Sequence, residues 1–458
     1  MDSRSASAPP ARWPLGVDRS GADAAEEARL RRSAAALAFA EGDQWATPPL
    51  RGESRITVNY ARAVVRKTAA YVFPAPVTFR AAGAARQEED GAAAAERALA
   101  AAVAALDLGA LDVALCIEAA TVGDAAVKVT WDAEGDAPVV APVDPATLSA
   151  RTAPDRPRQA LEITQRYGLP PERLAALGWL RDGHYAVPDR LLPVSERWTA
   201  DRWQVEVAGQ MVRDGENPYG WIPYVLLPND PRPHDLWGRS DLEDLYDACR
   251  EINSRISTLS RILDLSGAPI AVLENVDGSE GIAIRPGATW ELPEGARAYL
   301  LDLLGGGGVG LHVQALDLLF RALHDLSETP RTAFGDSGRN LSGAALEVEV
   351  QPLLQKVARK RRVWDAFFRE RNTRLLDVLD RFGGANLGGW RRMEAVWPSV
   401  LPSDLDGQVR NAALLVERGI HSRRSAVAAL GGDDPEGEFR KVLEELSLTA
   451  VGAVGEGR

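Results

Sequence analysis

The sequence predicts an α+β fold divided among several compact units. A mixed α/β part comes first, followed by two long helices around a small β-rich insert, a long helix and a small helical unit. Three observations support this class. The chain has 458 residues, 45% hydrophobic and 26% charged, which is enough apolar material for about three cores. Short β-like runs separated by Pro and Gly fill residues 136–230. From residue 238 onward, apolar residues recur mainly at helical spacing.

The N-terminal part is expected to alternate helices with short strands. Residues 1–20 are Ser, Ala, Pro and Arg in no periodic order, so a disordered tail is expected there. Apolar spacing and the turns or prolines that follow predict four helices: Ala22–Phe39, the part of Arg55–Phe73 after a strand-like start, Gly91–Leu106 and Leu108–Thr121. Strands are predicted for PVTFR, Ala125–Trp131, VVAPV, ALEITQRY, RWQVEVAG and WIPYVLL. The last four predict a mixed α/β domain with antiparallel pairs.

Two helices flank the β-rich insert. Ser240 is a predicted N-cap with Glu243 at the capping-box position, and the helix is expected to run to about Ser266. Its apolar stripe consists of Leu242, Leu245, Tyr246, Cys249, Ile252, Ile256, Leu259 and Leu263. The opposite face is polar and carries Arg250, Asn253, Ser254, Ser257, Ser260 and Arg261. The insert spans about residues 268–304, and a second helix is predicted from Leu311 to Leu326.

A flexible loop and the longest helix follow. The loop Ser327–Gly343 is rich in Pro, Gly and Ser. The helix is predicted from Gly343 to about Phe382, and Pro352 inside it predicts a kink, because proline removes a backbone donor and clashes one turn back. MEAVWPSVLP then predicts a strand, and the remaining sequence predicts a small helical unit.

Charge and composition exclude several classes of protein. The net charge of −12 and the pI near 5.2 argue against a broadly basic surface that coats nucleic acid. No run of 18 apolar residues is present, and the N-terminus lacks the apolar core of a secretory signal. Cys116 and Cys249 are far apart and are expected to be reduced and buried.

The short motifs do not assemble an active site. Gly305–Gly308 lacks the Lys-Ser/Thr pair of a phosphate-binding loop and is interpreted as a hinge. Gly335–Gly338, GDSG, matches part of a serine-protease turn but has no accompanying histidine signature, so a polar loop is the preferred interpretation. No metal-ligand spacing occurs, and neither a cofactor nor an enzymatic activity is expected. The basic run Arg359–Arg362 is most often a solvated helix face; a subunit or nucleic-acid contact is the alternative.

The order of segments from Gly238 to Phe382 resembles the portal proteins of tailed bacteriophages, the head–tail connectors of the siphophage type. The segments that carry the resemblance are WIPYVLLPND with LWGRSDLEDLYDACREINSRIS, GRNLSGAALEVEVQPLLQKVARKRRVWDAFFRERNTRLLDVL, RITVNYARAVVRKTAAYVF, GDAAVKV and WPSVLPSDLDGQVRNAALLVERGIHSRRSAVAALGGDDPEGEF. The resemblance covers about residues 25–446. It implies a portal fold that forms a ring, usually of twelve copies, at one vertex of the capsid.

The resemblance also implies a division of the chain. The expected parts are a disordered tail 1–20, the N-terminal wing 21–238, stem helix 239–266, clip 267–309, stem helix 310–326, tunnel loop 327–341, kinked helix with final wing strand 342–402, crown 403–446 and a C-terminal tail 447–458. In that family the stem lines a DNA tunnel and the clip faces the packaging motor and later the tail adaptor.

Site residues follow from this division. The expected tunnel-loop contacts to DNA are Arg331, Thr332, Ser337, Arg339 and Asn340; the two arginines bind either phosphate or a carboxylate on a neighbouring subunit. Channel-facing positions on the stem are expected at Arg250, Ser254, Ser257 and Arg261. Clip positions that face the motor or adaptor are expected at Glu274, Asn275, Asp277 and Glu280. The expected kink is at Pro352.

The implied partners are further copies of the chain, double-stranded DNA bound weakly and without sequence preference, the large terminase subunit, a head-completion adaptor, and the major capsid and scaffolding proteins, with no membrane. The implied location is the portal vertex of the virion, after assembly in the host cytoplasm. Two rival functions remain: a hydrolase that uses the Gly335–Gly338 loop, and a monomeric DNA-binding module.

Overall fold

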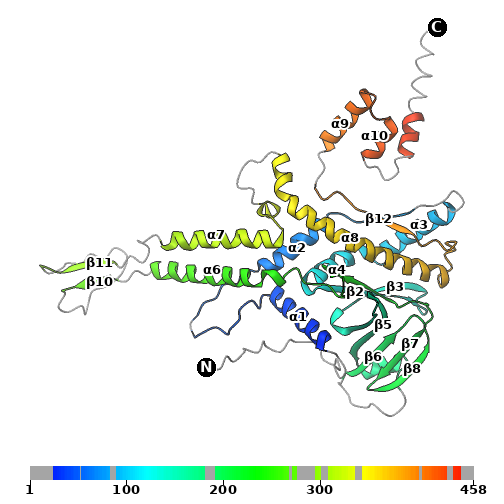
Figure 1. The fold of residues 1–458 in the computed structure, drawn as a ribbon, viewed down its shortest axis with the longest axis horizontal. Helices are drawn as coiled ribbons and strands as arrows, with labels where there is room; N and C mark the ends of the chain where they lie inside the picture. Colours follow the sequence, from blue (N-terminus) through cyan, green and yellow to red (C-terminus); the bar gives the residue numbers. More distant parts are fainter. Residues whose placement is uncertain are drawn as a thin grey trace, which may run out of the picture. The chain divides into compact units, whose positions relative to one another are not determined.

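The computed structural model describes residues 24–51, 53–82, 89–180, 191–267, 271–275, 294–300, 308–335, 343–401, 405–430 and 437–444. The chain divides into two compact units, Met1–Trp397 and Pro398–Arg458. It is a mixed α/β protein, in agreement with the predicted class (Figure 1). The predicted tails 1–20 and 447–458 lie outside the described residues.

The four N-terminal helices match the predictions closely. They are α1 (Ala24–Glu41), α2 (Tyr60–Val72), α3 (Glu89–Ala105) and α4 (Leu108–Val122). Asn59 caps α2, since its side chain accepts a hydrogen bond from the amide of Arg62. The strand-like start predicted at Arg55 is wrong: residues 55–59 are assigned to no strand, because their partners are side chains of a helix described below.

Four antiparallel sheets are present in the described part of the chain. A three-stranded sheet has the order β3-β2-β9 and a five-stranded sheet the order β4-β5-β6-β7-β8. Their strands are β2 (Asp124–Asp132), β3 (Ala137–Val143), β4 (Leu148–Ala153), β5 (Arg156–Leu169), β6 (Leu192–Trp198), β7 (Arg202–Val207), β8 (Gln210–Glu216) and β9 (Tyr224–Pro228). A short helix, α5 (Pro171–Ala176), follows β5. The antiparallel mixed α/β domain predicted for this region is confirmed.

Two further sheets each join strands that are distant in the sequence. β1 (Thr78–Ala81) pairs with β12 (Met393–Val396), so that Thr78 lies opposite Val396. β10 (Ala271–Glu274) pairs with β11 (Arg297–Leu300), which confirms β structure in the described part of the insert. Both β1 and β12 were predicted as strands. Their pairing joins residues of the first unit that are more than 300 positions apart in the sequence.

Two long helices lie side by side and point away from the sheets (Figure 1). They are α6 (Tyr246–Gly267) and α7 (Gly308–Ser327), and β10 and β11 lie in the segment between them. The predicted helix start at Ser240 is wrong: a short 3-10 turn, Glu243–Leu245, precedes α6. The Ser240 hydroxyl accepts a hydrogen bond from the Leu242 amide over 3.1 Å and donates to the carbonyl of Thr121 over 2.5 Å, which ties the segment to α4.

The longest helix, α8 (Gly343–Arg381), crosses the first unit. Its centre is buried: the Arg371 side chain is fully covered and forms an ion pair with Asp112 on α4. Pro352 lies inside α8, with helix on both sides, and the kink there stays a prediction. The second unit contains α9 (Leu405–Glu417) and α10 (Arg423–Ala429), as predicted for a helical C-terminal part.

Among the described residues, no single helix is both long and apolar enough to cross a membrane. The helices Asp90–Ala105 and Leu108–Val122, which are bent by 70° relative to each other, are long and apolar enough for a membrane span only when they are taken as a pair.

Candidate functional site

The paired helices α6 and α7, which we call the stem, are held by an apolar core at their base. The predicted stripe is confirmed at the base of the stem: Leu245, Cys249 and Ile252 are at most 1% exposed, and they cluster with Leu316 and Leu323 of α7. It is wrong at its far end, where Leu263 is 51% exposed. Both cysteines are free and buried, as predicted. The core fixes α6 against α7 and α2, so the stem continues directly from the body of the first unit.

The polar face of α6 is covered by an extended segment of the same chain, residues 44–51 and 53–58, which we call the strut. The Ile56 amide donates to the Ser257 hydroxyl, and the Val58 amide donates to the Asn253 side-chain oxygen, both over 2.9 Å. Asn253 Nδ2 donates to Gln44 Oε1 over 2.7 Å. Asn253 and Ser257 are only 1% and 8% exposed.

This arrangement bears on one predicted channel position. The Ser257 hydroxyl is buried beneath the strut within its own chain, and its place on a channel face stays a prediction. The polar pattern on α6 was interpreted as a wet face, whereas part of it is a set of hydrogen-bonding groups for an extended chain. Asn59, which hydrogen-bonds to Gln44, belongs to the same group of contacts and was missed.

The other three predicted stem positions remain accessible to different degrees. Arg250 is exposed, although its Nε lies 3.3 Å from the Gln44 carbonyl and its guanidinium packs over Phe39. Ser254 is half-buried and Arg261 is exposed. These three stay candidates for a channel face.

The described start of the tunnel loop is bonded to its own chain. Arg331 Nη2 donates to Asp317 Oδ1 on α7 over 2.9 Å, and its side chain is 40% exposed. For Arg331, the sequence predicted either a DNA phosphate or a carboxylate on a neighbouring subunit as the partner. In the structure, its partner is a carboxylate of the same chain. The Thr332 hydroxyl is buried and has no hydrogen-bond partner, so it is not placed to contact DNA.

The remaining tunnel-loop residues cannot be compared with the structure. Ser337, Arg339 and Asn340 lie outside the described residues, as does all of the GDSG turn except Gly335. In the described part of the chain, no group of three or more His, Cys, Asp and Glu residues is arranged to hold a metal ion.

Two of the four predicted clip positions are described. Glu274 ends β10, is exposed, and accepts a hydrogen bond from the Tyr299 hydroxyl of β11 over 3.2 Å. Asn275 follows it in a left-handed conformation with φ of 58°. Asp277 and Glu280 lie outside the described residues.

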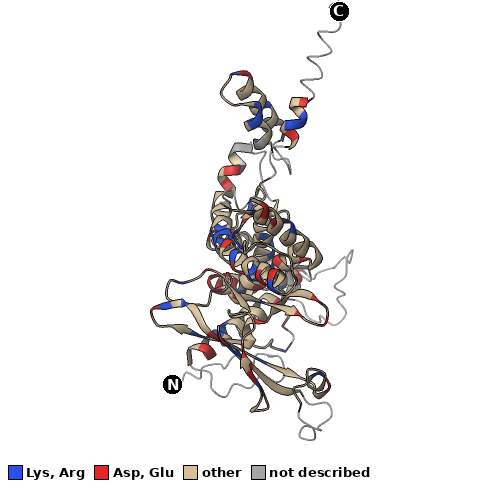
Figure 2. Cartoon of the chain, turned by 90° about the vertical axis from the view of Figure 1, so that its right-hand side faces the viewer, with Lys and Arg blue, Asp and Glu red and all other residues tan. Residues whose placement is uncertain are grey.

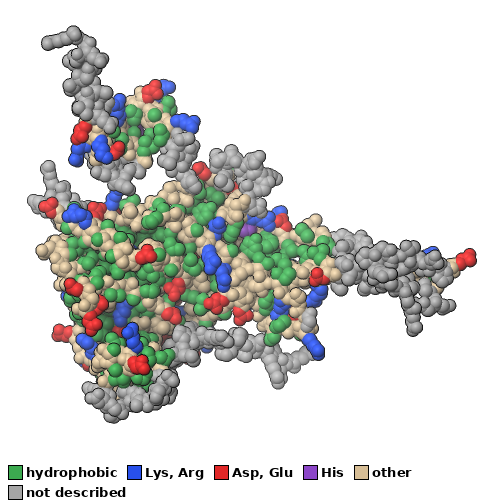
Figure 3. Space-filling view, turned by 180° about the vertical axis from the view of Figure 1, so that it is seen from behind, with side chains coloured by type: hydrophobic (Ala, Val, Ile, Leu, Met, Phe, Trp, Pro, Cys, Tyr) green, Lys and Arg blue, Asp and Glu red, His purple; other side chains and the backbone are tan. Residues whose placement is uncertain are grey.

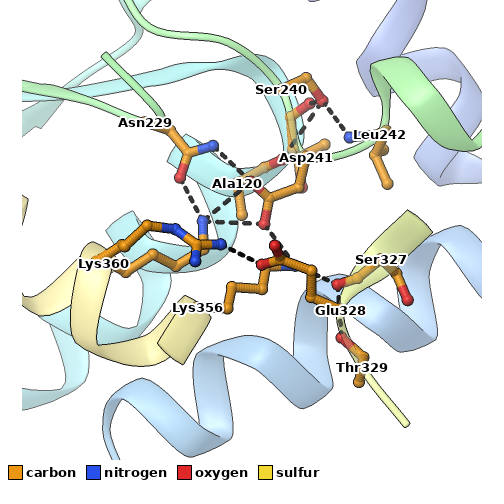
Figure 4. A network of polar contacts seen from close by, with 12 residues as sticks. Ala120, Asn229, Ser240, Asp241, Leu242, Ser327, Glu328, Thr329, Lys356 and Lys360 are labelled. Carbon is orange, nitrogen blue, oxygen red and sulfur yellow. Dashed lines mark hydrogen bonds and ion pairs between the residues drawn. The ribbon is translucent and has the colours of Figure 1, made fainter. Parts of the chain in front are cut away.

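A buried ionic network, which we call the stem-base junction, joins the stem to the rest of the first unit (Figure 4). It consists of Asn229, Asp241, Ser327, Lys356 and Lys360. Lys360 Nζ lies 2.9 Å from Asp241 Oδ2 and 2.6 Å from Asn229 Oδ1. Lys356 Nζ lies 3.3 Å from the same carboxylate and donates to the Ser327 carbonyl over 3.0 Å.

The junction connects five parts of the fold at one carboxylate. Asp241 precedes α6, Ser327 ends α7 and begins the tunnel-loop segment, and both lysines lie on α8. Asn229 follows β9 and donates to Asp241 Oδ1 over 2.8 Å. A polar cleft of about 500 Å³ opens beside this network and is lined by Arg239, Leu326 and Arg359 among others.

Charge balance in the junction depends on Asp241. Burial alone raises the pKa of a carboxyl group, but the two ammonium groups and the amide of Asn229 outweigh it, and the pKa of Asp241 lies far below its usual range. Burial lowers the pKa of Lys356, while Asp241 opposes that change. The carboxylate is thus charged at neutral pH and compensates two cations whose side chains are 10% and 12% exposed.

The basic run on α8 is divided between the surface and the interior of the protein. Arg359 pairs with Glu328, and Lys360 belongs to the junction. Arg361 donates to the carbonyl of Val72 over 3.0 Å and packs over Trp397. Arg362 is exposed. The interpretation as a solvated helix face therefore holds for Arg359 and Arg362 and is wrong for Lys360 and Arg361.

The junction was missed by sequence reasoning, although one signal was available. The chain has five lysines. Three of them, Lys128, Lys356 and Lys360, form ion pairs in which both the lysine and its acidic partner are largely buried. In a chain that otherwise uses arginine, two lysines four positions apart on one helix face indicate compact cationic groups directed into the fold.

Comparison with known families gives a match in the C-terminal part of the chain. Residues 312–450 match the family described as phage portal protein, SPP1 Gp6-like. The matched segment includes most of α7, then α8, β12, α9 and α10. No curated protein matches the chain.

The match confirms the resemblance to tailed-bacteriophage portal proteins. Over this C-terminal part, the chain is similar to phage portal proteins. Proteins of this class are generally structural components of the virion at the capsid vertex and not enzymes.

Proposed function

We propose that this chain assembles into a ring, of twelve copies in the capsid, whose central channel carries double-stranded DNA during packaging and ejection. The ring docks the large terminase subunit first and a head-completion adaptor afterwards, and it sits among the major capsid and scaffolding proteins. In this proposal the wing, stem, clip, tunnel loop and crown have the boundaries expected from the sequence.

The observation that carries the proposal is the order and pairing of elements from residue 246 to 381. Two paired helices enclose a segment with a two-stranded sheet, and a long helix follows after a loop. The family match begins in the second of these helices and continues through the long one. An elongated stem that projects from a sheet-containing body suits packing of many copies around an axis.

The charge distribution supports weak contact with DNA. In the described part of the chain, acidic and basic residues are intermixed along the ribbon (Figure 2). Arg331, Arg359 and Arg361 are all bonded within the chain. Since affinity for DNA grows with the number of phosphates neutralised, an acidic chain whose arginines near the stem base are paired internally favours sliding over tight binding.

Light scattering after size-exclusion chromatography tests assembly. The proposal expects a mass that is a large multiple of 49.3 kDa, and binding to DNA that disappears at moderate salt. A monomer at every concentration would instead support the DNA-binding-module alternative. For the hydrolase alternative, Ser337→Ala is the relevant variant: an esterase or protease activity that this substitution abolishes would contradict the proposal.

A further inference from the structure

We propose that a groove on the first unit binds an extended peptide segment of another protein, and that this segment combines apolar residues with an acidic residue. The groove, which we call the β9 groove, has a volume of about 730 Å³ and is lined mainly by parts of β5, β9 and α8. Three features support peptide binding: an open strand edge, an apolar lining and two arginines that have no ion-pair partner among the described residues. The proposal does not depend on ring formation.

β9 is an edge strand, with a partner on only one side. In the three-stranded sheet it pairs with β2 alone, in unbroken antiparallel register. At one end, the Val129 amide donates to the Pro223 carbonyl. At the other end, the Asn229 amide donates to the Gly123 carbonyl. Because main-chain groups alternate in direction along a strand, the odd-numbered positions of β9 bond to β2 and the even-numbered positions face away from it.

The positions of β9 that face away from β2 line the groove. They are Tyr224, Leu226 and Pro228. The Tyr224 carbonyl accepts a hydrogen bond from Arg374 over 2.5 Å. No described residue hydrogen-bonds to the main-chain amide or carbonyl of Leu226, which is half-buried. An extended peptide can pair with this amide and carbonyl as an added strand, since a sheet edge provides main-chain donors and acceptors.

The opposite edge of the same sheet carries prolines that hinder such pairing. β3 is the other edge strand, and β2 bonds to it through its even-numbered positions. The register then directs the main chain of Pro138 and Pro142 away from β2. Proline has no amide hydrogen, so it cannot donate to an added strand and it protects an exposed edge. β9 is therefore the edge of this sheet that is better suited to an added strand.

β5 forms another wall of the groove and is also incompletely paired there. It pairs with β4 from Arg156 to Gln165, but its pairing with β6 begins only at Ile163. The lining residues 158–161 therefore have a neighbouring strand on one side only. An extended segment in the groove would lie beside two strands that each lack a partner on one side.

The lining of the groove is largely apolar and partly accessible. Leu161 is 43% exposed, Leu226, Leu236 and Val363 are half-buried, and Phe367 is buried. Hydrophobic side chains are visible over much of the body and the stem in the space-filling view, so an apolar lining alone does not single out this groove (Figure 3). Combined with an open strand edge, the lining favours a peptide whose alternate side chains are apolar.

Two arginines give the groove a local positive charge. Arg158 and Arg362 line it, are exposed, and form no ion pair with any described residue. A third arginine, Arg374, is paired with Glu370. In a chain with a net charge of −12, such a site favours a partner segment that carries Asp or Glu.

A peptide suits the groove better than DNA does. The phosphates of a DNA backbone only accept hydrogen bonds, so they would leave the Leu226 carbonyl without a donor. A peptide main chain offers both amides and carbonyls, and its acidic side chains can pair with Arg158 and Arg362.

Selection from a library of random nine-residue peptides displayed on yeast, with the full-length protein as the target, tests the proposal. The selected peptides should carry apolar residues at alternate positions and at least one Asp or Glu. After synthesis with a fluorescein label, their binding to the unmodified protein is measured as a Kd by fluorescence anisotropy.

The variant Leu226→Pro tests the role of the strand edge. It removes the open amide, while Val225 and Leu227 keep their hydrogen bonds to β2, as proline is tolerated on edge strands. Peptide binding should become at least about ten-fold weaker, because an added strand loses a main-chain hydrogen bond and meets the proline ring. Circular dichroism shows whether the variant is folded.

The double variant Arg158→Glu with Arg362→Glu tests the charge and leaves the strand edge unchanged. It should also weaken binding at least about ten-fold, since attraction becomes repulsion. Arg369→Glu is the matched control, because Arg369 is exposed on α8 but does not line the groove. Its effect should stay within about two-fold. The charge reversal decides alone if Leu226→Pro does not fold.

Four results would overturn the proposal. The first is a selection that enriches no acidic and apolar peptide, or peptides whose binding the folded variants leave unchanged. The second is duplex DNA whose binding is lost in the charge reversal but kept in Leu226→Pro, which would assign the groove to phosphate. The third is peptide binding that appears only after removal of residues 1–20, which would assign it to the chain's own N-terminal segment. The fourth is a lower assembled mass of Leu226→Pro in light scattering, which would assign it to another copy.

Discussion

At the scale of single residues, Asp241 determines the charge balance of the stem-base junction. Its carboxylate is the acidic partner of both Lys356 and Lys360. Asp241→Asn leaves two buried ammonium groups uncompensated, and we expect a loss of about 3–5 kcal/mol in the free energy of unfolding. Urea denaturation measures it. Asp244→Asn is the control, because Asp244 is 73% exposed and lies 3.9 Å from Arg239. Equal stability of the two variants would contradict the role of the junction.

Glu118 on α4 gives the first unit a pH-dependent stability. Burial, assisted by repulsion from Asp144, raises the pKa of Glu118 to about 7. A carboxyl group whose pKa is higher in the folded state stabilises the protein while protonated, and this stabilisation is lost as the pH rises from about 4.5 to about 7.

The variant Glu118→Gln removes that dependence. We expect it to be more stable than the parent protein by roughly 1–3 kcal/mol at pH 8 and equal to it at pH 4. Thermal melting across this range measures the difference. A constant difference between the two proteins at all pH values would show that Glu118 does not titrate as its environment requires.

Gly238 is required by a close approach of three backbone segments. A Cβ atom there would lie 2.1 Å from the Asn229 carbonyl oxygen and 2.4 Å from that of Gly123. Gly238→Ala should therefore destabilise the protein by several kcal/mol, on the order of 3. Gly109→Ala on α4 is the control: nothing lies within 4 Å of its Cβ, and helix propensity predicts a gain of up to about 1 kcal/mol. Calorimetry of both variants tests the difference in sign.

Residue-level predictions from the sequence succeeded where the signal was local. The apolar stripe of α6 and the two buried cysteines were predicted, because burial follows the helical period. The burial of the Ser257 and Thr332 hydroxyl groups was not predicted. The Ser257 hydroxyl accepts a hydrogen bond from Ile56, which is distant in the sequence, and no local pattern reveals such a contact.

At the scale of elements, the strut shows how a polar helix face can be used inside a protein. Asn253 and Ser257 accept hydrogen bonds from two strut amides that otherwise have no partner in a strand.

Helices and strands were predicted well because apolar spacing and proline stops are local. The pairing of β1 with β12 and the binding of the strut to α6 depend on contacts across the chain, and the sequence does not encode them locally.

The strut should detach when its acceptors are removed. In the double variant Asn253→Ala with Ser257→Ala, hydrogen exchange at the amides of Ile56 and Val58 should become at least about ten-fold faster, since each lost hydrogen bond contributes about 1 kcal/mol. Ser254→Ala is the matched control, as this half-buried serine lies on the same helix. Unchanged protection of both amides in the double variant would contradict the hydrogen bonds that define the strut.

At the scale of the whole molecule, the acidic net charge agrees with the proposed role. Each copy brings a charge of −12, and the arginines and lysines near the stem base are largely bonded within the chain. A channel made from such copies attracts DNA weakly, which permits movement. The class of protein was predicted from the order of its segments and is supported by the family match over residues 312–450.

Negative-stain electron microscopy of the purified full-length protein tests the central claim most directly. If the chain forms the proposed ring, end views should show ring-shaped particles with a central hole, and side views should show a narrow stem that projects from a wider body. Uniform small particles without a hole, at concentrations where portal rings would persist, would contradict it.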